Sequence, residues 1–137
     1  MIIMSVDLGL ARTGLAVSDT SENFAFPKGV ISEKDENALT QKICEKAREF
    51  SAGRIVVGLP KNMDGTLGER AQTSIRIAEK ITEISGIETV LFDERLTTVS
   101  AHNFLNMNDV RGKKRKNTVD TVAATLILED YLRSNKK

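Results

Sequence analysis

Apolar residues in the first third of the chain fall into short runs separated by turn-forming residues. The run Ile2–Leu8 is apolar at almost every position, which predicts a buried strand. A second strand is predicted over 15–19, after a glycine-containing turn. A third is predicted over 24–31, where Pro27 favours a place at the edge of a sheet. Three short consecutive strands predict an antiparallel meander.

Beyond residue 35 the apolar residues change to helical spacing and then alternate between the two patterns. Thr66 and Glu69 match a capping box, so Thr66 is the expected N-cap of one helix. The predicted elements are a helix between 35 and 53, a strand over 54–59, a helix from 66 to 86, a strand over 88–93, a short helix over 98–106, a basic loop over 107–116 and a final helix over 117–133. The order βββαβαβαα predicts an α/β fold with a five-stranded mixed sheet flanked by helices. We expect one domain over residues 1–137.

The composition is that of an ordinary globular domain, with 40% hydrophobic and 28% charged residues. Aromatic residues make up 4% and tryptophan is absent, so base stacking is not expected to be the main mode of binding. Cys44 is the only cysteine, which excludes an internal disulfide and a cysteine zinc site. The sequence shows neither a basic leader nor an apolar run long enough to span a bilayer, so we expect a cytoplasmic protein.

The net charge of +1 hides an uneven distribution of charge. The stretch Arg111–Lys116 holds five basic residues and no acid, while the rest of the chain is acidic overall. A basic segment beside an acidic body suggests a phosphate-rich partner that meets one face of the protein.

Three acids occur where an acid is structurally awkward. Asp7 interrupts an apolar strand, Glu94 follows another strand, and Asp120 lies near the start of the last helix. Strand ends and helix starts of an α/β sheet gather at one rim, so the three acids are expected to converge. Two carboxylates about 5 Å apart repel by roughly 3 kcal/mol. A divalent cation would offset this repulsion, and oxygen ligands suit Mg²⁺ or Mn²⁺.

Each acid also has a purely structural interpretation. Asp7 is well placed to form a turn before a glycine, and Glu94 to pair with Arg95. Asp120 follows Asn117 by three residues, where an acid favours the helix dipole. Spacing alone therefore leaves the metal site open.

Four stretches in order resemble one known family. They are Asp7-Leu-Gly-Leu-Ala-Arg-Thr-Gly-Leu-Ala16, Gly58-Leu-Pro-Lys-Asn-Met-Asp-Gly65, Asp93-Glu-Arg-Leu-Thr-Thr98, and Asp120-Thr-Val-Ala-Ala124 with Leu126-Ile-Leu128. Together they resemble the YqgF family, bacterial proteins similar to the RuvC-type Holliday junction resolvases. The resemblance runs from Ile2 to about Tyr131 and implies a ribonuclease H-like fold.

The resemblance implies a metal-dependent nuclease that hydrolyses phosphodiester bonds and acts in 5′-end processing of pre-16S ribosomal RNA. The metal-binding acids of the superfamily fall on Asp7, Glu94 and Asp120, with Mg²⁺ or Mn²⁺ as cofactor and Asp7 bridging two ions. Resolvases similar to RuvC have a fourth acid near the last one, and residues 121–128 offer none. The implied partners are pre-ribosomal RNA or branched DNA, together with ribosomal particles.

Several basic or polar residues near these motifs are candidate contacts to nucleic acid. Arg12 is expected in the turn between the first two strands, and Arg95 directly follows a proposed ligand. Lys61 and Asn62 follow a strand end, in a loop expected to face the substrate. The remaining candidates are Arg111, Lys113, Lys114, Arg115 and Lys116, which would contact the backbone without reading sequence. The alternative is a surface turn for Arg12, a solvated loop for 111–116, and for Arg95 a contact that restrains Glu94.

Three other functions compete with this interpretation. A nucleotide-binding ATPase of the actin or sugar-kinase type needs two such domains, and the sequence has no Gly-rich lysine loop. A non-catalytic nucleic-acid-binding factor of ribosome assembly would use the basic segment and not the acids. A DNA junction resolvase would need a dimer, and no dimer surface stands out, so we expect a monomer or a weak homodimer.

Overall fold

The computed structural model describes the backbone of residues 1–93 and 112–135, and the side chains of 1–93 and 122–134. Five strands form one sheet: β1 (Ile2–Leu8), β2 (Arg12–Ser18), β3 (Ala25–Ser32), β4 (Ala52–Leu59) and β5 (Glu88–Asp93). Three helices are described: α1 (Glu36–Glu49), α2 (Glu69–Ser85) and α4 (Gly112–Asn135). None of these helices is long and apolar enough to cross a membrane.

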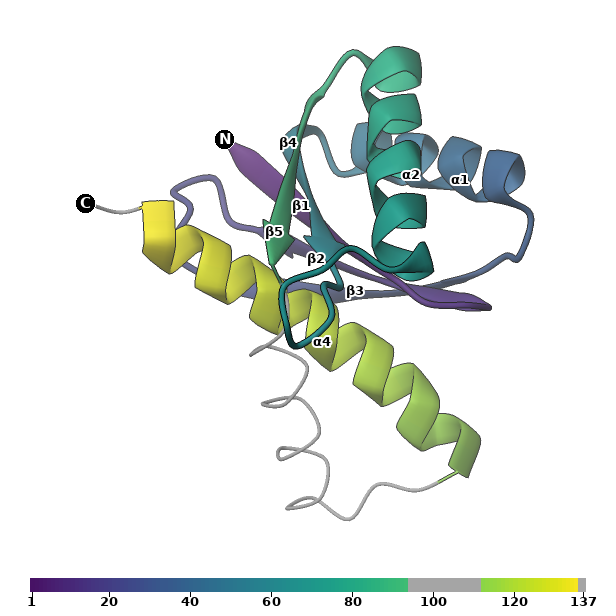
Figure 1. Cartoon of the computed structure of the whole chain (residues 1–137). Helices are drawn as coiled ribbons and strands as arrows, with labels where there is room; N and C mark the ends of the chain where they lie inside the picture. The colour runs from purple at the N-terminus through teal and green to yellow at the C-terminus, as the bar shows by residue number, and fades with distance from the viewer. Residues whose placement is uncertain (94–111, 136–137) are drawn as a thin grey trace.

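The strands lie in the order β3-β2-β1-β4-β5 (Figure 1). The hairpins β1–β2 and β2–β3 are antiparallel, while β1, β4 and β5 run parallel to one another. This arrangement confirms the predicted meander and the five-stranded mixed sheet of an α/β fold. It also confirms that the strand containing Pro27 lies at an edge.

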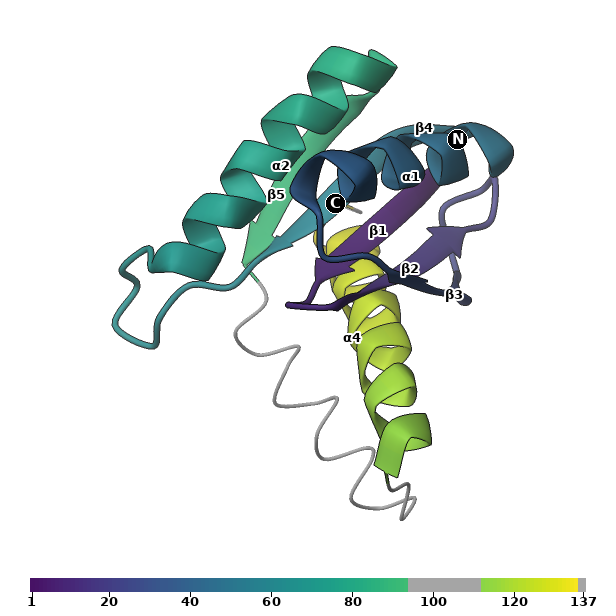
Figure 2. The same cartoon turned by 90° about the vertical axis from the view of Figure 1, so that its right-hand side faces the viewer.

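Helices α1 and α2 cover one face of the sheet and α4 covers the other (Figure 2). Side chains of β1 alternate between the two faces: Met4 and Val6 pack with α1 and α2, whereas Ile3 packs with α4. Both faces of β1 are therefore buried, which explains why its sequence is apolar at almost every position.

The outer strand β3 departs from regular pairing. Its ladder with β2 shifts register between Gly14 and Ala16, and Gly29 on the β3 side has a φ of 93°. Pro27, which has no N–H, lies beside this irregularity. The edge strand is thus bulged and lacks one backbone donor.

The predicted capping box at Thr66 is wrong. Helix α2 begins at Glu69, and its N-cap is Gly68. Asp64 is the residue that captures Thr66, since its Oδ1 accepts from the Thr66 backbone N–H at 3.0 Å and from the Thr66 hydroxyl at 2.7 Å. A local Asx turn therefore uses the side chain that the sequence pattern assigned to the helix. The predicted end at Gly86 is confirmed, because this glycine has a left-handed φ of 73°.

The predicted loop over 107–116 is wrong for its described part. Helix α4 begins at Gly112, so residues 112–116 are helical. Lysine and arginine are good helix formers, and a run of them does not by itself break a helix. The predicted short helix over 98–106 lies outside the described residues.

Candidate functional site

Three parallel strands end at the same edge of the sheet. The last residues of β1, β4 and β5 are Leu8, Leu59 and Asp93. Asp7 is the next-to-last residue of β1 and is half-buried. By strand alternation it lies on the same face as Ile3, the face that α4 covers. Asp7 therefore lies where an open α/β sheet commonly binds its ligand.

Glycines occupy the sheet positions on both sides of Asp7. Gly14 of β2 is its direct partner across the antiparallel ladder. On β4, Gly58 is the position after the paired residues Val6 and Val57, so it lies beside Asp7 on the other side. Neither neighbouring strand therefore places a side chain directly opposite Asp7. Both glycines are themselves buried, so other parts of the protein cover the backbone on either side of Asp7.

Contacts along one side of α4 fix this helix on the sheet. The Ser5 hydroxyl donates to the Ala124 carbonyl at 2.7 Å. The Arg54 guanidinium donates through Nη1 to the Tyr131 hydroxyl at 3.0 Å, and the Tyr131 ring packs edge-on against Phe92 with 6.1 Å between centroids. Followed from Tyr131 back to Ala124, the helix therefore runs toward the edge of the sheet at which Asp7 lies.

The backbone relates position 120 to Asp7. Position 120 precedes Ala124 by one turn, or about 6 Å along the helix axis. Asp7 follows Ser5 by two residues, or about 7 Å along β1. Both steps start from the Ser5–Ala124 hydrogen bond and lead toward the same edge.

Several predicted site residues fall outside the side-chain description. Glu94, Arg95 and Arg111 lie outside the described residues, and position 94 directly follows the end of β5 at Asp93. For Asp120 and the basic residues Lys113, Lys114, Arg115 and Lys116, the structure describes the helical backbone alone. Among the side chains that are described, no three His, Cys, Asp or Glu residues form a metal-ligand cluster. The predicted triad therefore stays a prediction.

The chemistry of the donors at this edge fits a hard divalent cation. Asp7 offers carboxylate oxygens from a rigid central strand, and Gly14 and Gly58 leave the adjacent sheet positions without side chains. Carboxylate oxygens are the kind of ligand that Mg²⁺ and Mn²⁺ bind. Asp7, the one acid of the predicted set whose side chain is described, therefore has the donor atoms that such an ion takes.

Arg12 lies on the same face as Asp7. It is the first residue of β2, not a residue of the turn as predicted, and it pairs with Ser32 at the end of β3. Together with Glu33 and Lys34 it lines a shallow pocket of about 390 Å³ at this edge. Its position suits a contact to an anionic group that reaches Asp7.

The tight turn between β1 and β2 depends on Gly9. The Gly9 N–H donates to the Arg12 carbonyl at 2.9 Å. A Cβ at Gly9 would lie 2.3 Å from that carbonyl oxygen, closer than any side chain permits. The turn next to Asp7 is therefore closely packed backbone.

Lys61 and Asn62 lie in the loop between β4 and α2, as predicted. The Asn62 backbone N–H donates to the Thr66 carbonyl at 2.9 Å, and its side-chain amide donates to the Thr66 hydroxyl at 2.9 Å. The Asn62 side chain thus holds the loop together. Lys61, at the base of the loop, is half-buried.

Sequence reasoning did not single out Arg70. This second residue of α2 donates through Nη2 to the Leu8 carbonyl at 3.0 Å, across 62 positions of sequence. The residue that accepts this hydrogen bond directly follows Asp7. Had the start of α2 been predicted correctly, Arg70 would have been placed in the first turn of the helix, at the edge where β1 ends.

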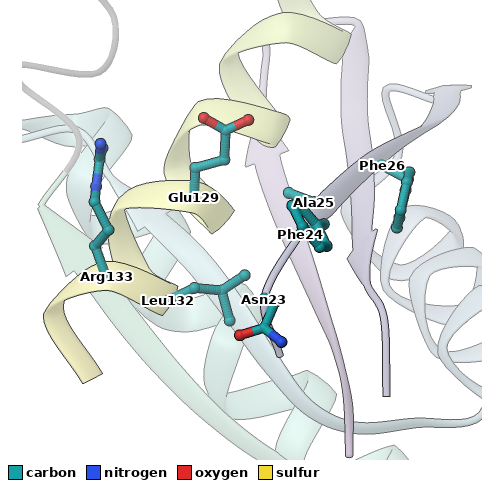
Figure 3. A pocket seen from close by; sticks show the side chains of 7 residues that line it. All are labelled: Asn23, Phe24, Ala25, Phe26, Glu129, Leu132 and Arg133. Carbon is teal, nitrogen blue, oxygen red and sulfur yellow. The ribbon is translucent and has the colours of Figure 1, made fainter. Parts of the chain in front are cut away.

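A second pocket lies at the opposite end of the sheet. It has a volume of about 310 Å³ and lies between the start of β3 and the C-terminal part of α4 (Figure 3). Phe24 and Phe26 line it with exposed fractions of 65% and 48%, beside Leu132 and Arg133 of α4. β3 begins there opposite the last residue of β2, whereas Asp7 lies opposite Gly14 near the start of β2. The pocket is separate from the Asp7 edge.

Solved structures with the same fold include Holliday junction resolvases. RuvC from T. thermophilus, in a complex with Holliday junction substrate, superimposes with a TM-score of 0.63 over 99% of this chain and 97% of that one, at 13% identity. The Fowlpox virus resolvase, also with junction DNA, gives 0.62 over 100% of both chains at 13% identity. The fold is therefore that of the ribonuclease H-like, RuvC-type resolvases, as the resemblance implied.

Closer relatives define the family. The model of the RuvX family, described as "Holliday junction resolvase", matches residues 1–134, and the chain belongs to this family. A Thermoanaerobacter pseudethanolicus relative is 41% identical over 137 residues, covering 99% of both chains. A Bacillus cytotoxicus relative is 40% identical over 138 residues, covering 98% of this chain and 99% of its own. Both bear the name "Putative pre-16S rRNA nuclease".

Proposed function

We propose that this protein is a nuclease that hydrolyses phosphodiester bonds in nucleic acid, with the 5′ end of pre-16S ribosomal RNA as its target. Membership of the RuvX family and the names of its relatives support the activity. The observation that carries the proposal is the place of Asp7: half-buried, on a central strand, at the carboxyl edge, and flanked by Gly14 and Gly58.

In this proposal the catalytic acids are Asp7, Glu94 and Asp120. The backbone supports the set, since position 94 directly follows β5 and position 120 lies one turn before Ala124. The strand and the helix that carry them are fixed by the sheet ladder and by the Ser5–Ala124 hydrogen bond. Three acids from three distant segments would then meet at one edge.

These acids would hold Mg²⁺ or Mn²⁺. When bound, the cation would offset the charge of the scissile phosphate and activate a water for attack. The role of Asp7 is to present its carboxylate from a strand buried on both faces, so that its position varies little. Arg12, on the same face, would orient the phosphate by its guanidinium.

The basic residues would hold the rest of the nucleic acid. The first turns of α4, residues 112–116, lead away from the sheet beyond the stretch that packs on it (Figure 2). Lys61 lies in the loop that follows the neighbouring strand β4. With Arg95 and Arg111, these residues would bind backbone phosphates on either side of the cleaved bond without reading bases.

A branched DNA is the second candidate substrate, because the family that matches this chain is described as Holliday junction resolvase. RNA and DNA present the same phosphodiester to Asp7, so the edge itself fits both. The choice between them depends on the residues that surround the strand outside the cleaved bond.

The test compares the parent with Asp7→Asn on two substrates, a pre-16S RNA 5′ fragment and a four-way DNA junction, each with Mg²⁺ and with a chelator. We expect Mg²⁺-dependent cutting of the RNA by the parent and none by the variant, with an unchanged circular dichroism spectrum. Glu45→Gln, an exposed acid on α1, is the control and should cut as the parent does. Cutting of the junction alone would favour the second substrate, binding without cutting would make the protein a non-catalytic factor, and full activity of Asp7→Asn would refute this site.

A further inference from the structure

The Arg70 side chain reaches from the first turn of α2 to the end of β1. We propose that Arg70 is a positioning residue that holds the peptide after Asp7 and thereby keeps the Asp7 carboxylate in the geometry that binds the cation. This inference rests on the proposed function, because it concerns the same acid.

The Leu8 carbonyl needs a hydrogen-bond donor. Leu8 is 8% exposed, and it is the last residue of β1. Buried carbonyls are almost always hydrogen-bonded, because leaving one without a donor costs free energy. Arg70 supplies a charged donor at 3.0 Å, which is stronger than a neutral one.

The segment that Arg70 holds is constrained on both sides. On one side of Leu8, Asp7 pairs with Gly14 in the β1–β2 ladder. On the other side, Gly9 forms a turn too tight to admit a Cβ. Arg70 binds between these two constraints, so its hydrogen bond acts on a backbone with few other conformations.

The backbone that carries Arg70 is itself held in place. The loop before α2 is closed by the hydrogen bonds between Asn62 and Thr66, and Ala71, the next residue of the helix, is fully buried. The rest of the Arg70 side chain is exposed at the edge where Asp7 lies. In metal sites, residues that do not touch the metal often orient the side chains that do. Arg70 would act on the Asp7 carboxylate in this way, through the backbone next to it.

Arg76, on the same helix, provides a matched comparison. It binds Glu36 of α1 through Nη2 at 2.7 Å and is remote in sequence from the Asp7 edge. Loss of Arg76 should lower stability without affecting Asp7. Arg70→Met and Arg76→Met therefore each remove a guanidinium from α2. The guanidinium of Arg70 is hydrogen-bonded to β1, whereas that of Arg76 is bound to α1.

The experiment titrates Mn²⁺ into the full-length protein, following the free ion by electron paramagnetic resonance, for the parent, Arg70→Met, Arg70→Lys, Arg76→Met and Asp7→Asn. We expect Arg70→Met to bind Mn²⁺ about tenfold or more weakly than the parent. Its kcat should fall by a similar factor, while the KM for RNA changes less. Arg70→Lys, which keeps a charged donor, should recover most of the affinity, and Arg76→Met should bind as the parent does.

Equal Mn²⁺ affinity and kcat in Arg70→Met and the parent would overturn the role of Arg70 and leave the proposed function intact. Equal losses in Arg70→Met and Arg76→Met would also overturn it, since the effect would then be general destabilisation. A parent that binds Mn²⁺ no better than Asp7→Asn would overturn the cation site and this inference together. Circular dichroism checks folding, and Arg70→Gln, too short to reach Leu8, replaces Arg70→Met if the latter unfolds.

Discussion

The Ser5 hydroxyl donates a hydrogen bond of 2.7 Å to the Ala124 carbonyl, joining the central strand to α4 across 119 positions of sequence. Both residues are fully buried. The bond sets how far along the sheet α4 lies, and therefore how position 120 is placed relative to Asp7. It thus links the stability of the core to the geometry of the proposed site.

Replacing this serine tests the link. Ser5→Ala should lower the free energy of unfolding by about 1 kcal/mol, the usual net value of one hydrogen bond. Cleavage should fall by more than stability explains, because α4 loses its fixed position. Urea denaturation and a cleavage assay measure the two effects. Ser134→Ala, which removes a hydroxyl bound within the last turn of α4, is the control and should change neither. An unaltered cleavage rate in folded Ser5→Ala would argue against the link.

Glu36 should make stability depend on acid pH. Hydrogen bonds from Arg76, then from Lys80, lower the pKa of Glu36 from 4.5 to about 2. A carboxyl with a lowered pKa stabilises the fold above its unfolded pKa, and this contribution is lost as the pH falls from 4.5 toward 2. Glu36→Gln should therefore cost about 1 kcal/mol at pH 7, since the pairs are partly exposed, and almost nothing near pH 2.

Thermal unfolding of the parent and Glu36→Gln between pH 7 and pH 2 checks this. Glu79→Gln, which alters an exposed acid on α2, should follow the parent at every pH. A difference between the parent and Glu36→Gln that stays constant down to pH 2 would contradict the assigned cause.

Gly58 should be required both for activity and for full stability. Gly58→Val places a branched side chain at a buried position beside Asp7. The added side chain overpacks its surroundings, so the free energy of unfolding should fall by about 1–3 kcal/mol. Cleavage should fall at least about tenfold, because the substrate phosphate loses its place next to Asp7. Steady-state kinetics together with urea denaturation measure both, and retained activity would show that the substrate approaches from elsewhere.

The basic segment 111–116 should govern the salt dependence of binding. Changing its five basic residues to glutamine should reduce the slope of log K against log salt by up to about 3.5 for a single strand. Fluorescence anisotropy of labelled RNA between low and moderate salt gives the slope. Neutralising Lys42, Lys46 and Arg48 on α1 is the control and should leave it close to the parent value. A slope that stays the same in the first variant would exclude the segment from the interface.

Local patterns predicted most of the scaffold. The buried run Ile2–Leu8, the helix after Asp35 and the helix end at Gly86 depend on residues close in sequence, and the structure confirms each. The predicted helix starts were wrong where local interactions compete. Asp64 binds Thr66 before the helix can use it, and the basic residues after Gly112 join α4.

The site depends on contacts that no local pattern contains. Asp7 was found because an acid in an apolar strand stands out. The roles of Gly14 and Gly58 follow only from strand register, and the Arg70–Leu8 hydrogen bond spans 62 positions. Sequence could therefore single out Asp7 as a candidate, while its neighbours on the adjacent strands had to come from the fold.

The irregular outer strand has a consequence for how molecules meet in solution. A regular edge strand presents unpaired backbone donors and acceptors, to which a strand of another molecule can add. Pro27 and the bulge at Gly29 interrupt the donors and acceptors that such an addition would need along β3. Copies of this protein should consequently not polymerise through β3 even at high concentration.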